Sequence, residues 1–299
     1  MRVWIALSLI AVSVGCSGKG EVPPPVSAPA VNPGSHAEHS PPPEEVQSTH
    51  SNHGGHEQMQ MPAATARKLV VKTEPTQPQA GEATQLRFQI LDDSGQPITK
   101  FALLHEKLVH LIVVREGLDE FSHLHPQVDA SGNITIEHVF PKAGQYRLFA
   151  DHQPEGQTPG LARGELIVAG DDELAAALVP NASDEVAVGE IKAHVAFQPG
   201  DQETTVRFHL VDASDQVVSD LQPYLGAMGH LVIISADGAE YVHAHPLSES
   251  QTAPEGAVEF AAHFPKPGLY KAWGQFQRHG TVFTVPFVLQ HSPAYPSAH

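Results

Sequence analysis

The chain contains two stretches in which short runs of β-branched and aromatic residues are separated by turn residues. Short runs of this kind, without helical segments that alternate with the strands, are typical of an all-β sandwich and not of a parallel α/β sheet. In the first stretch they predict seven strands, near residues 68–74, 84–91, 108–115, 119–125, 133–140, 144–151 and 161–168. We therefore expect an immunoglobulin-like (Ig-like) β-sandwich there.

The second stretch repeats the first. Residues 86–126 align without a gap with residues 206–246, and the match resumes further on in a Gly-x-Tyr sequence that is present in both copies. That sequence is the pattern of the tyrosine corner of immunoglobulin-type domains. The repeat predicts two tandem Ig-like β-sandwich domains, over residues 67–169 and 187–290.

The segments outside the domains predict export. Residues 1–16 combine a charged start, a short apolar run and Cys16 in a sequence that resembles a bacterial lipobox, where the cysteine is lipidated. The apolar run is shorter than the roughly 20 residues that span a bilayer. We expect a signal peptide and a protein that faces the periplasm or the cell surface, anchored to the membrane through its N-terminal lipid only. An ordinary cleaved signal peptide is the alternative.

Three further segments are expected to lie outside the sandwiches. Residues 170–186 form an interdomain linker, in which a short helix is expected over residues 171–178, and residues 291–299 form a tail. Residues 17–66 are rich in proline and small polar residues and predict a disordered tether. Imidazoles suit several transition metals and thioethers favour Cu(I), so the tether is an auxiliary copper-binding segment or, alternatively, merely polar. Its candidate ligands are His36, His39, His50, His53, His56, Met59 and Met61.

Composition narrows the function classes. The 17 Lys+Arg against 34 Asp+Glu give a net charge of −17, which argues against nucleic acid as a partner because such binding needs cationic side chains. The single cysteine excludes an internal disulfide framework and cysteine-based metal clusters. The 20 histidines outnumber all lysines and arginines together, and they direct attention to metal ions as partners.

Each domain places three histidines on one face of a predicted β-hairpin. Turn signals at residues 117–118 and 237–238 set the register of the two hairpins. Opposed residues have Cβ atoms about 4.5–5.5 Å apart, so three imidazoles converge on one ion with bonds near roughly 2.0–2.1 Å. We therefore predict a metal site in each domain. The ligands are His110, His123 and His125 in the first copy and His230, His243 and His245 in the second.

A fourth ligand is expected from the strand that runs antiparallel to the first strand of each hairpin. Its end brings Asp151 or His152 near the first copy's histidines, and Gln275 or Phe276 near those of the second. Met228 is expected to share the face of the second set. A carboxylate suits zinc or Cu(II), whereas a thioether or amide resembles the weak axial ligand of a copper site.

The remaining histidines lack a matching partner in the other copy. We interpret them as surface or core residues without a shared role: His105, His138, His194, His209, His263, His279, His291 and His299. The same alternative applies to the two sets of three, since a lone buried histidine is usually a hydrogen-bonded core residue.

Three motifs carry a resemblance to known domains. In the second copy they are Gly229-His230-Leu231-Val232, His243-Ala244-His245-Pro246 and Phe264-Pro265-Lys266-Pro267-Gly268-Leu269-Tyr270. With these the chain resembles uncharacterised bacterial secreted and lipoprotein domains, and the first copy departs from the pattern in having Val109 in place of the glycine. In design it is also similar to CopC-type and YtkA-like periplasmic copper proteins. The resemblance implies heavy-metal handling in the periplasm.

Three functions compete. The first is a lipoprotein that captures, buffers or delivers copper, with zinc as the alternative metal and a periplasmic metal-transport or efflux component as partner. The second is a zinc-dependent hydrolase or lyase with a three-histidine site. No general base or nucleophile motif accompanies that site, so we predict no catalytic residue and favour a protein that is not an enzyme. The third is a metal-free structural or adhesive Ig-like surface module.

Overall fold

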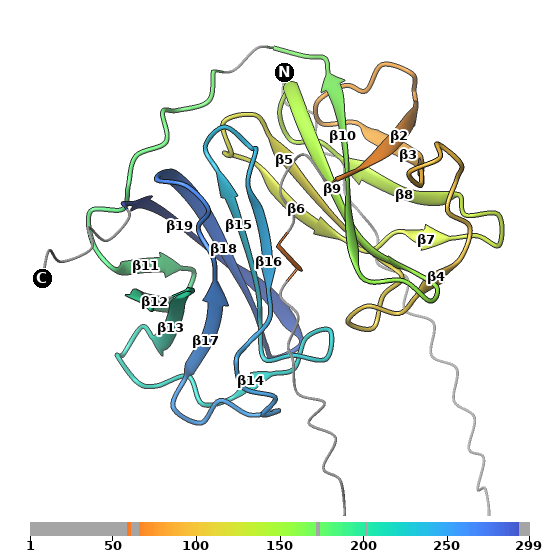
Figure 1. Ribbon diagram of the computed structural model, residues 1–299. Helices are drawn as coiled ribbons and strands as arrows, with labels where there is room; N and C mark the ends of the chain where they lie inside the picture. The colour runs from red at the N-terminus through yellow and green to blue at the C-terminus, as the bar shows by residue number, and fades with distance from the viewer. Residues whose placement is uncertain (1–58, 61–65, 172–173, 201, 293–299) are drawn as a thin grey trace, which may run out of the picture. The chain divides into compact units, whose positions relative to one another are not determined.

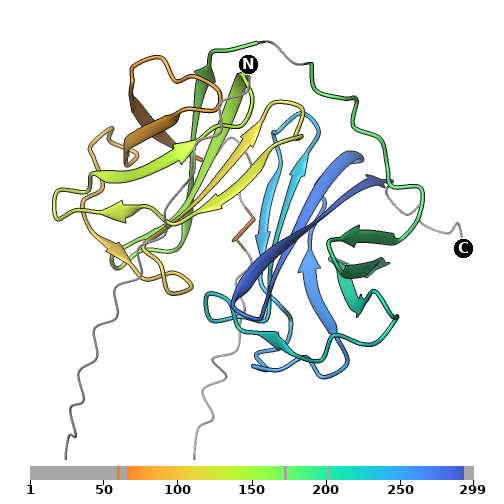
Figure 2. The same ribbon diagram turned by 180° about the vertical axis from the view of Figure 1, so that it is seen from behind.

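The computed structural model describes residues 59–60, 66–171, 174–200 and 202–292, which form two tandem immunoglobulin-like β-sandwiches (Figures 1 and 2). Within these ranges no helix is long and apolar enough to cross a membrane. Cys16, Met61 and the tether histidines lie outside the described residues, as does the side chain of Met59.

The first sandwich contains strands β2 to β10. One sheet has the order β6–β5–β9–β10, with β4 beside β9, and the other has the order β2–β3–β8–β7. A short parallel ladder between β10 and β2 joins the two sheets. The strands are β2 (Arg67–Glu74), β3 (Ala83–Ile90), β4 (Phe101–Ala102), β5 (Val109–Arg115), β6 (Phe121–Leu124), β7 (Gln127–Val128), β8 (Ile134–Val139), β9 (Gly144–Pro154) and β10 (Gly160–Val168).

The second sandwich pairs the sheet β11–β12–β13–β17 with the sheet β16–β15–β18–β19, in which β14 also pairs with β18. Strand β1 (Met59–Gln60), from the predicted tether, pairs with the edge strand β16. The strands are β11 (Glu185–Val188), β12 (Ile191–Pro199), β13 (Thr204–Asp212), β14 (Leu221–Gln222), β15 (His230–Ser235), β16 (Tyr241–Ala244), β17 (Ala257–Ala262), β18 (Gly268–Arg278) and β19 (Thr281–His291).

The all-β sandwich architecture agrees with the prediction. The seven strands expected in the first copy correspond to β2, β3, β5, β6, β8, β9 and β10, with ends shifted by a few residues. Both tyrosine corners are present: the hydroxyl of Tyr146 donates to the Lys142 carbonyl at 2.9 Å, and that of Tyr270 to the Lys266 carbonyl at 2.8 Å.

The expected connecting helix is wrong. Residues 174–180 have no regular secondary structure. So short a helix is marginal without tertiary support, and the contacts present hold the chain in another conformation. Leu178 packs against a cluster of buried residues to which both sandwiches contribute. Beyond it, the backbone N–H of Asn181 donates to the Val288 carbonyl, and its side-chain oxygen accepts from the Val288 N–H.

Strands β5 and β15 are buried along their whole length because the sandwiches pack against each other through these sheets. Alternate residues of a strand face opposite sides of a sheet. Leu111 and Val113 therefore enter the core of the first sandwich, whereas Ile112 and Val114 contact the second. The cluster between the sandwiches, here called the interface core, consists of Ile112, Val114, Leu118, Phe149, Leu161, Val232, Ile234, Tyr241 and Trp273.

The interface is reciprocal. Phe149 stacks on Tyr241 with ring centroids 4.9 Å apart, and Phe121 stacks on Trp273 at 4.6 Å. In the sequence repeat Phe121 corresponds to Tyr241 and Phe149 to Trp273, so the two stacks are the same contact with the domains exchanged. Both repeats thus use the same surface to bind each other.

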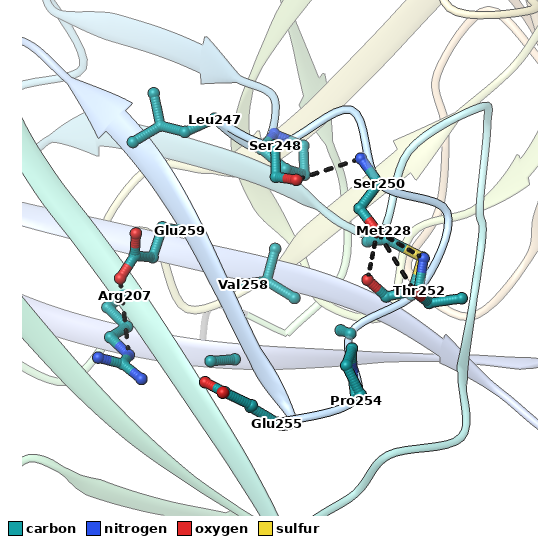
Figure 3. A pocket seen from close by; sticks show the side chains of 13 residues that line it. Arg207, Met228, Leu247, Ser248, Ser250, Thr252, Pro254, Glu255, Val258 and Glu259 are labelled. Atoms are coloured by element: carbon teal, nitrogen blue, oxygen red, sulfur yellow. Dashed lines mark hydrogen bonds and ion pairs between the residues drawn. The ribbon is translucent and has the colours of Figure 1, made fainter.

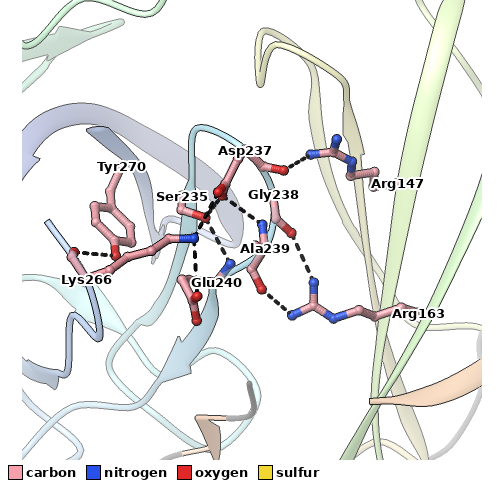
Figure 4. Close-up of polar contacts among 9 residues, drawn as sticks. All are labelled: Arg147, Arg163, Ser235, Asp237, Gly238, Ala239, Glu240, Lys266 and Tyr270. Carbon is pink, nitrogen blue, oxygen red and sulfur yellow. Dashed lines mark hydrogen bonds and ion pairs between the residues drawn. The ribbon is translucent and has the colours of Figure 1, made fainter. Parts of the chain in front are cut away.

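Charged side chains extend this interface to the hairpin turns (Figure 4). The guanidinium of Arg147 donates to the Asp237 carbonyl at 2.7 Å. Arg163 donates to the carbonyls of Gly238 and Ala239 at 3.0 and 2.9 Å. In the opposite direction, Lys271 donates to the Leu118 carbonyl at 2.7 Å. These bonds hold each hairpin turn against the other sandwich.

We predict that Trp273→Ala lowers the free energy of unfolding by about 3–5 kcal/mol, because it empties a buried ring site. The control Ile167→Ala, at a side chain 71% exposed on β10, should change it by less than about 0.5 kcal/mol. Urea unfolding of the full chain measures both. Equal costs for the two variants would contradict packing of the sandwiches in solution.

Candidate metal centre

The predicted hairpin register is present in both domains. Leu111 pairs with Leu124, and Leu231 pairs with Ala244, which turns the three histidines of each copy to the same side. In each set one ring nitrogen per histidine lies within 4.8 Å of the other two. We call His110, His123 and His125 triad 1, and His230, His243 and His245 triad 2.

The triads meet at the interface and form one cluster. Within triad 1 the ring centroids of His110 and His123 are 5.3 Å apart. Across the interface, the ring of His243 lies equally close, 5.6 Å from His110 and 5.3 Å from His123. Six imidazoles therefore surround one region between the sandwiches, where the sequence predicted two separate sites.

The first histidine of each triad is oriented by a backbone carbonyl of its own domain. His110 Nε2 lies 2.8 Å from the Leu104 oxygen, and His230 Nε2 lies 2.9 Å from the Tyr224 oxygen. A carbonyl oxygen only accepts hydrogen bonds, so each ring carries its proton on Nε2. The Nδ1 atom of each ring therefore carries a lone pair, and a ring nitrogen with a lone pair is the atom that binds a metal.

The second histidine of each triad is oriented by the other domain. His123 Nδ1 donates to Gln275 Oε1 at 2.6 Å, and Gln275 Nε2 donates to the Thr284 hydroxyl at 3.2 Å. His243 Nδ1 donates to Asp151 Oδ2 at 2.7 Å, and the same oxygen accepts from the Tyr241 hydroxyl at 2.6 Å. In both rings the proton is on Nδ1, so Nε2 carries the lone pair.

These outer bonds leave lone pairs that face one another. His110 Nδ1 and His123 Nε2 lie 3.0 Å apart, and neither carries a hydrogen in the tautomers just assigned. Ligand nitrogens at roughly 2.0–2.1 Å from a tetrahedral ion are roughly 3.3 Å apart, so this separation fits a shared cation. Four more ring nitrogens are buried without a hydrogen-bond partner in the described residues: His125 Nε2, His230 Nδ1, His243 Nε2 and His245 Nε2.

Burial keeps these rings neutral. It lowers the pKa of His125 to about 4 and that of His230 to about 3. It also lowers the pKa of the other members of both triads, and nearby histidines add to the effect in His123 and His243. Neutral imidazole is the form that binds metal ions, and burial extends the neutral form of these rings to lower pH.

Asp151 is the buried carboxyl beside the cluster. Burial raises its pKa to about 6, although the hydrogen bond from Tyr241 and the nearby histidines act in the opposite direction. It is therefore ionised at neutral pH and accepts the hydrogen bond that His243 Nδ1 donates.

The predicted fourth ligands make hydrogen bonds that the topology alone does not predict, while Asp151 Oδ1 is buried without a partner in the described residues. Asp151 lies opposite His110 and Gln275 lies opposite His230, as the topology predicts. Both side chains nevertheless accept hydrogen bonds from a histidine of the other domain, at His243 and His123. The reason is that the sheets face each other, so side chains on this face reach across the interface.

The two alternatives to these residues do not join the cluster. His152 is buried and donates to the Ala150 carbonyl, with Arg67 beside its other nitrogen. Phe276 lies in the core of the second sandwich.

Met228 does not join the histidines either. It lies in the core of the second sandwich and lines a cavity of about 460 Å³ (Figure 3). Strand β15 begins at His230, so the strand alternation that would have placed Met228 on the same face does not extend back to it. The described part of the site is therefore made of nitrogen ligands without a thioether.

One residue of the cluster was missed. The ring of His105 stacks on His245 with centroids 3.5 Å apart, and it lies 6.1 Å from His110 and 6.5 Å from His230. Its counterpart in the second copy is Leu225, so a search for repeated histidines passes over it. No sequence signal marks this position.

Comparisons with known proteins concern the fold and the family. A family described as a domain of unknown function, DUF8832, matches residues 64–161 and again residues 184–292. A search of curated proteins finds no match.

Solved structures show a distant likeness. A tetra-tandem repeat of a large adhesion protein has 12% identity and a TM-score of 0.25, over 76% of this chain and 50% of that chain. Invasin, a bacterial integrin-binding protein, has 12% identity and a TM-score of 0.21, over 74% of this chain and 39% of that chain. A segment of two fibronectin type III domains from chicken tenascin has 11% identity and a TM-score of 0.21, over 76% of this chain and 99% of that chain. The chain thus spans half the length of the first structure.

We predict that the metal-free protein loses stability as the pH falls below about 6.5. Histidines of the unfolded chain are protonated near their ordinary pKa of about 6.5. In the folded protein the buried rings stay neutral until the pH reaches their lowered pKa, about 4 for His125 and about 3 for His230. Each such ring contributes a slope of about 1.4 kcal/mol per pH unit in that window. Asp151, with its raised pKa, opposes this trend between about pH 4 and 6 and offsets part of it.

Urea unfolding in the presence of a chelator, from pH 7.5 to 5, measures this slope. His125→Gln should make it shallower, whereas Ile167→Ala, at an exposed side chain that does not titrate, should leave it unchanged. An unchanged slope in the His125 variant would show that its ring is not buried as a neutral group.

Proposed function

The chain belongs to the DUF8832 family, which it matches over both sandwiches, and we propose that it is an exported protein that binds transition-metal ions between its two domains. The observation that carries the proposal is the pair of histidine triads at the interface, in each of which one ring nitrogen per histidine lies within 4.8 Å of the others. A buried polar atom without a partner costs about 1–3 kcal/mol, and a bound cation removes that cost.

The donor set favours copper in the Cu(II) state, with zinc as the alternative. Imidazole suits copper, zinc and nickel, and at a given nitrogen site Cu(II) binds more tightly than Zn(II). The placement of Met228 in the sandwich core weakens the case for Cu(I) at this site. Asp151 behind His243 makes a carboxylate–histidine pair, which raises the basicity of the ligand and fixes its tautomer.

Other features of the sequence support metal capture, buffering or delivery outside the cytoplasm. The signal peptide and lipobox cysteine predict a lipid-anchored protein, and the tether offers histidines and methionines that collect ions. The net charge of −17 raises the local concentration of cations. A periplasmic metal-transport or efflux component is the partner that fits this role. No general base or nucleophile motif accompanies the three-histidine sets in the sequence, and we propose binding without catalysis.

A metal-free structural or adhesive module is the competing function. It is favoured by the aromatic stacks and by the bonds of Arg163 and Lys271, which hold the sandwiches together without an ion. In that case the neutral imidazoles merely fill the interface. The two functions differ in how the folded protein responds to metal.

We predict that the full chain binds two tight equivalents of Cu(II) or Zn(II). The second ion should bind more weakly, because the triads adjoin and like charges repel. His123→Ala/His125→Ala and His243→Ala/His245→Ala should each remove one ion. The control His194→Ala/His209→Ala, a cross-strand pair away from the interface, should keep both. Metal titration with a competing chelator measures this, and wild-type binding in both triad variants would contradict the assignment.

Thermal unfolding separates the two functions. Free metal at 100 times its dissociation constant should stabilise the protein by about 2.7 kcal/mol at one site. A metal-free module should unfold at the same temperature with and without metal. The His243→Ala/His245→Ala variant should show a smaller shift than the wild type.

A further inference from the structure

We infer that Asp151 and Gln275 are positioning residues that act across the interface, each orienting a metal-binding histidine of the opposite domain. Asp151 of the first sandwich serves triad 2, and Gln275 of the second serves triad 1. Each ion site is then complete only when both domains are docked. The inference rests on the proposed function for its metal-binding arms, but the crossed hydrogen bonds can be tested without metal.

The exchange is reciprocal in the repeat. Residues 140–151 correspond to residues 264–275, so Asp151 and Gln275 occupy equivalent positions at the ends of β9 and β18. Each lies opposite the first histidine of its own triad. Each nevertheless accepts the Nδ1 proton of the second histidine in the other triad. Because the two hydrogen bonds are related by the sequence repeat, we interpret them as a feature that both domains share and not as two independent contacts.

Both acceptors are held in place by further bonds. Asp151 is fully buried, and its Oδ2 accepts from both His243 and Tyr241 of the second sandwich. Gln275 is 7% exposed, and its amide nitrogen donates to Thr284 of the neighbouring strand. The acceptor oxygens are therefore aimed at the opposite domain before any ion binds.

The two acceptors differ in charge, and this makes the sites unequal. A carboxylate behind an imidazole raises its basicity more than a neutral amide does, and loss of such outer-shell partners typically costs 10–100-fold in metal affinity. We therefore expect triad 2, backed by Asp151, to take the first ion. Triad 1, backed by Gln275, takes the second.

The test measures Zn(II) affinity in full chains that keep one triad. In the His123→Ala/His125→Ala background, adding Asp151→Asn should weaken the remaining site by roughly tenfold or more. Adding Gln275→Leu there should change it by less than about threefold, because its partner His123 is gone.

In the His243→Ala/His245→Ala background the pattern should reverse. Gln275→Leu should weaken the remaining site by roughly tenfold, and Asp151→Asn should have the smaller effect. In the same background Gln275→Glu keeps an acceptor and adds charge, so this variant should bind Zn(II) at least as tightly as the His243→Ala/His245→Ala parent does. Such a rescue is not expected of a residue that merely stabilises the fold.

Ring N–H proton resonances of the metal-free protein provide a second measurement if a double variant does not fold. Gln275→Leu should alter the hydrogen-bonded Nδ1–H resonance of His123 and leave that of His243 in place. Asp151→Asn should do the reverse. Larger effects of Asp151→Asn on triad 1 than on triad 2 would overturn the inference. If the parent protein binds no Zn(II), the proposed function fails, and these resonances still decide whether the bonds cross.

Discussion

The structure depends on the packing of two sandwiches through the same surface of each. Strands β5 and β15 carry apolar residues on both sides, so each domain completes its burial only against the other. The aromatic stacks of Phe121 and Phe149 form one part of this surface, and the histidine triads form another. Burial of the imidazoles is therefore a consequence of docking, and the properties of the candidate site follow from it.

Burial keeps the rings neutral, and hydrogen bonds on their outer side choose the tautomer. Carbonyls of each domain hold His110 and His230, whereas acceptors from the opposite domain hold His123 and His243. The lone pairs consequently point inward to a region that both domains line. Under the proposed function, metal binding and domain docking stabilise each other, because an ion that binds only the docked domains favours the docked state.

Much of this could be predicted from the sequence, since the signals are local. Strand alternation, turn residues and the repeat were sufficient for the strands, the hairpin register and the membership of both triads. Register also placed Asp151 opposite His110, but it does not say which domain a side chain reaches. That depends on how two sheets pack, which has no period in the sequence. For the same reason His105, supplied by a turn without a histidine in the other copy, was missed, and Met228, just before its strand, was placed on the wrong side.

The central claim is that the ions lie between the domains and are held by both triads. Anomalous diffraction from crystals of the protein loaded with Cu(II) or Zn(II) tests it most directly. We expect two peaks at the interface, one about 2.0–2.1 Å from the inward nitrogens of His110, His123 and His125, and the other equally close to those of triad 2. Peaks confined to surface histidines, or none at the interface of a folded protein, would contradict the account.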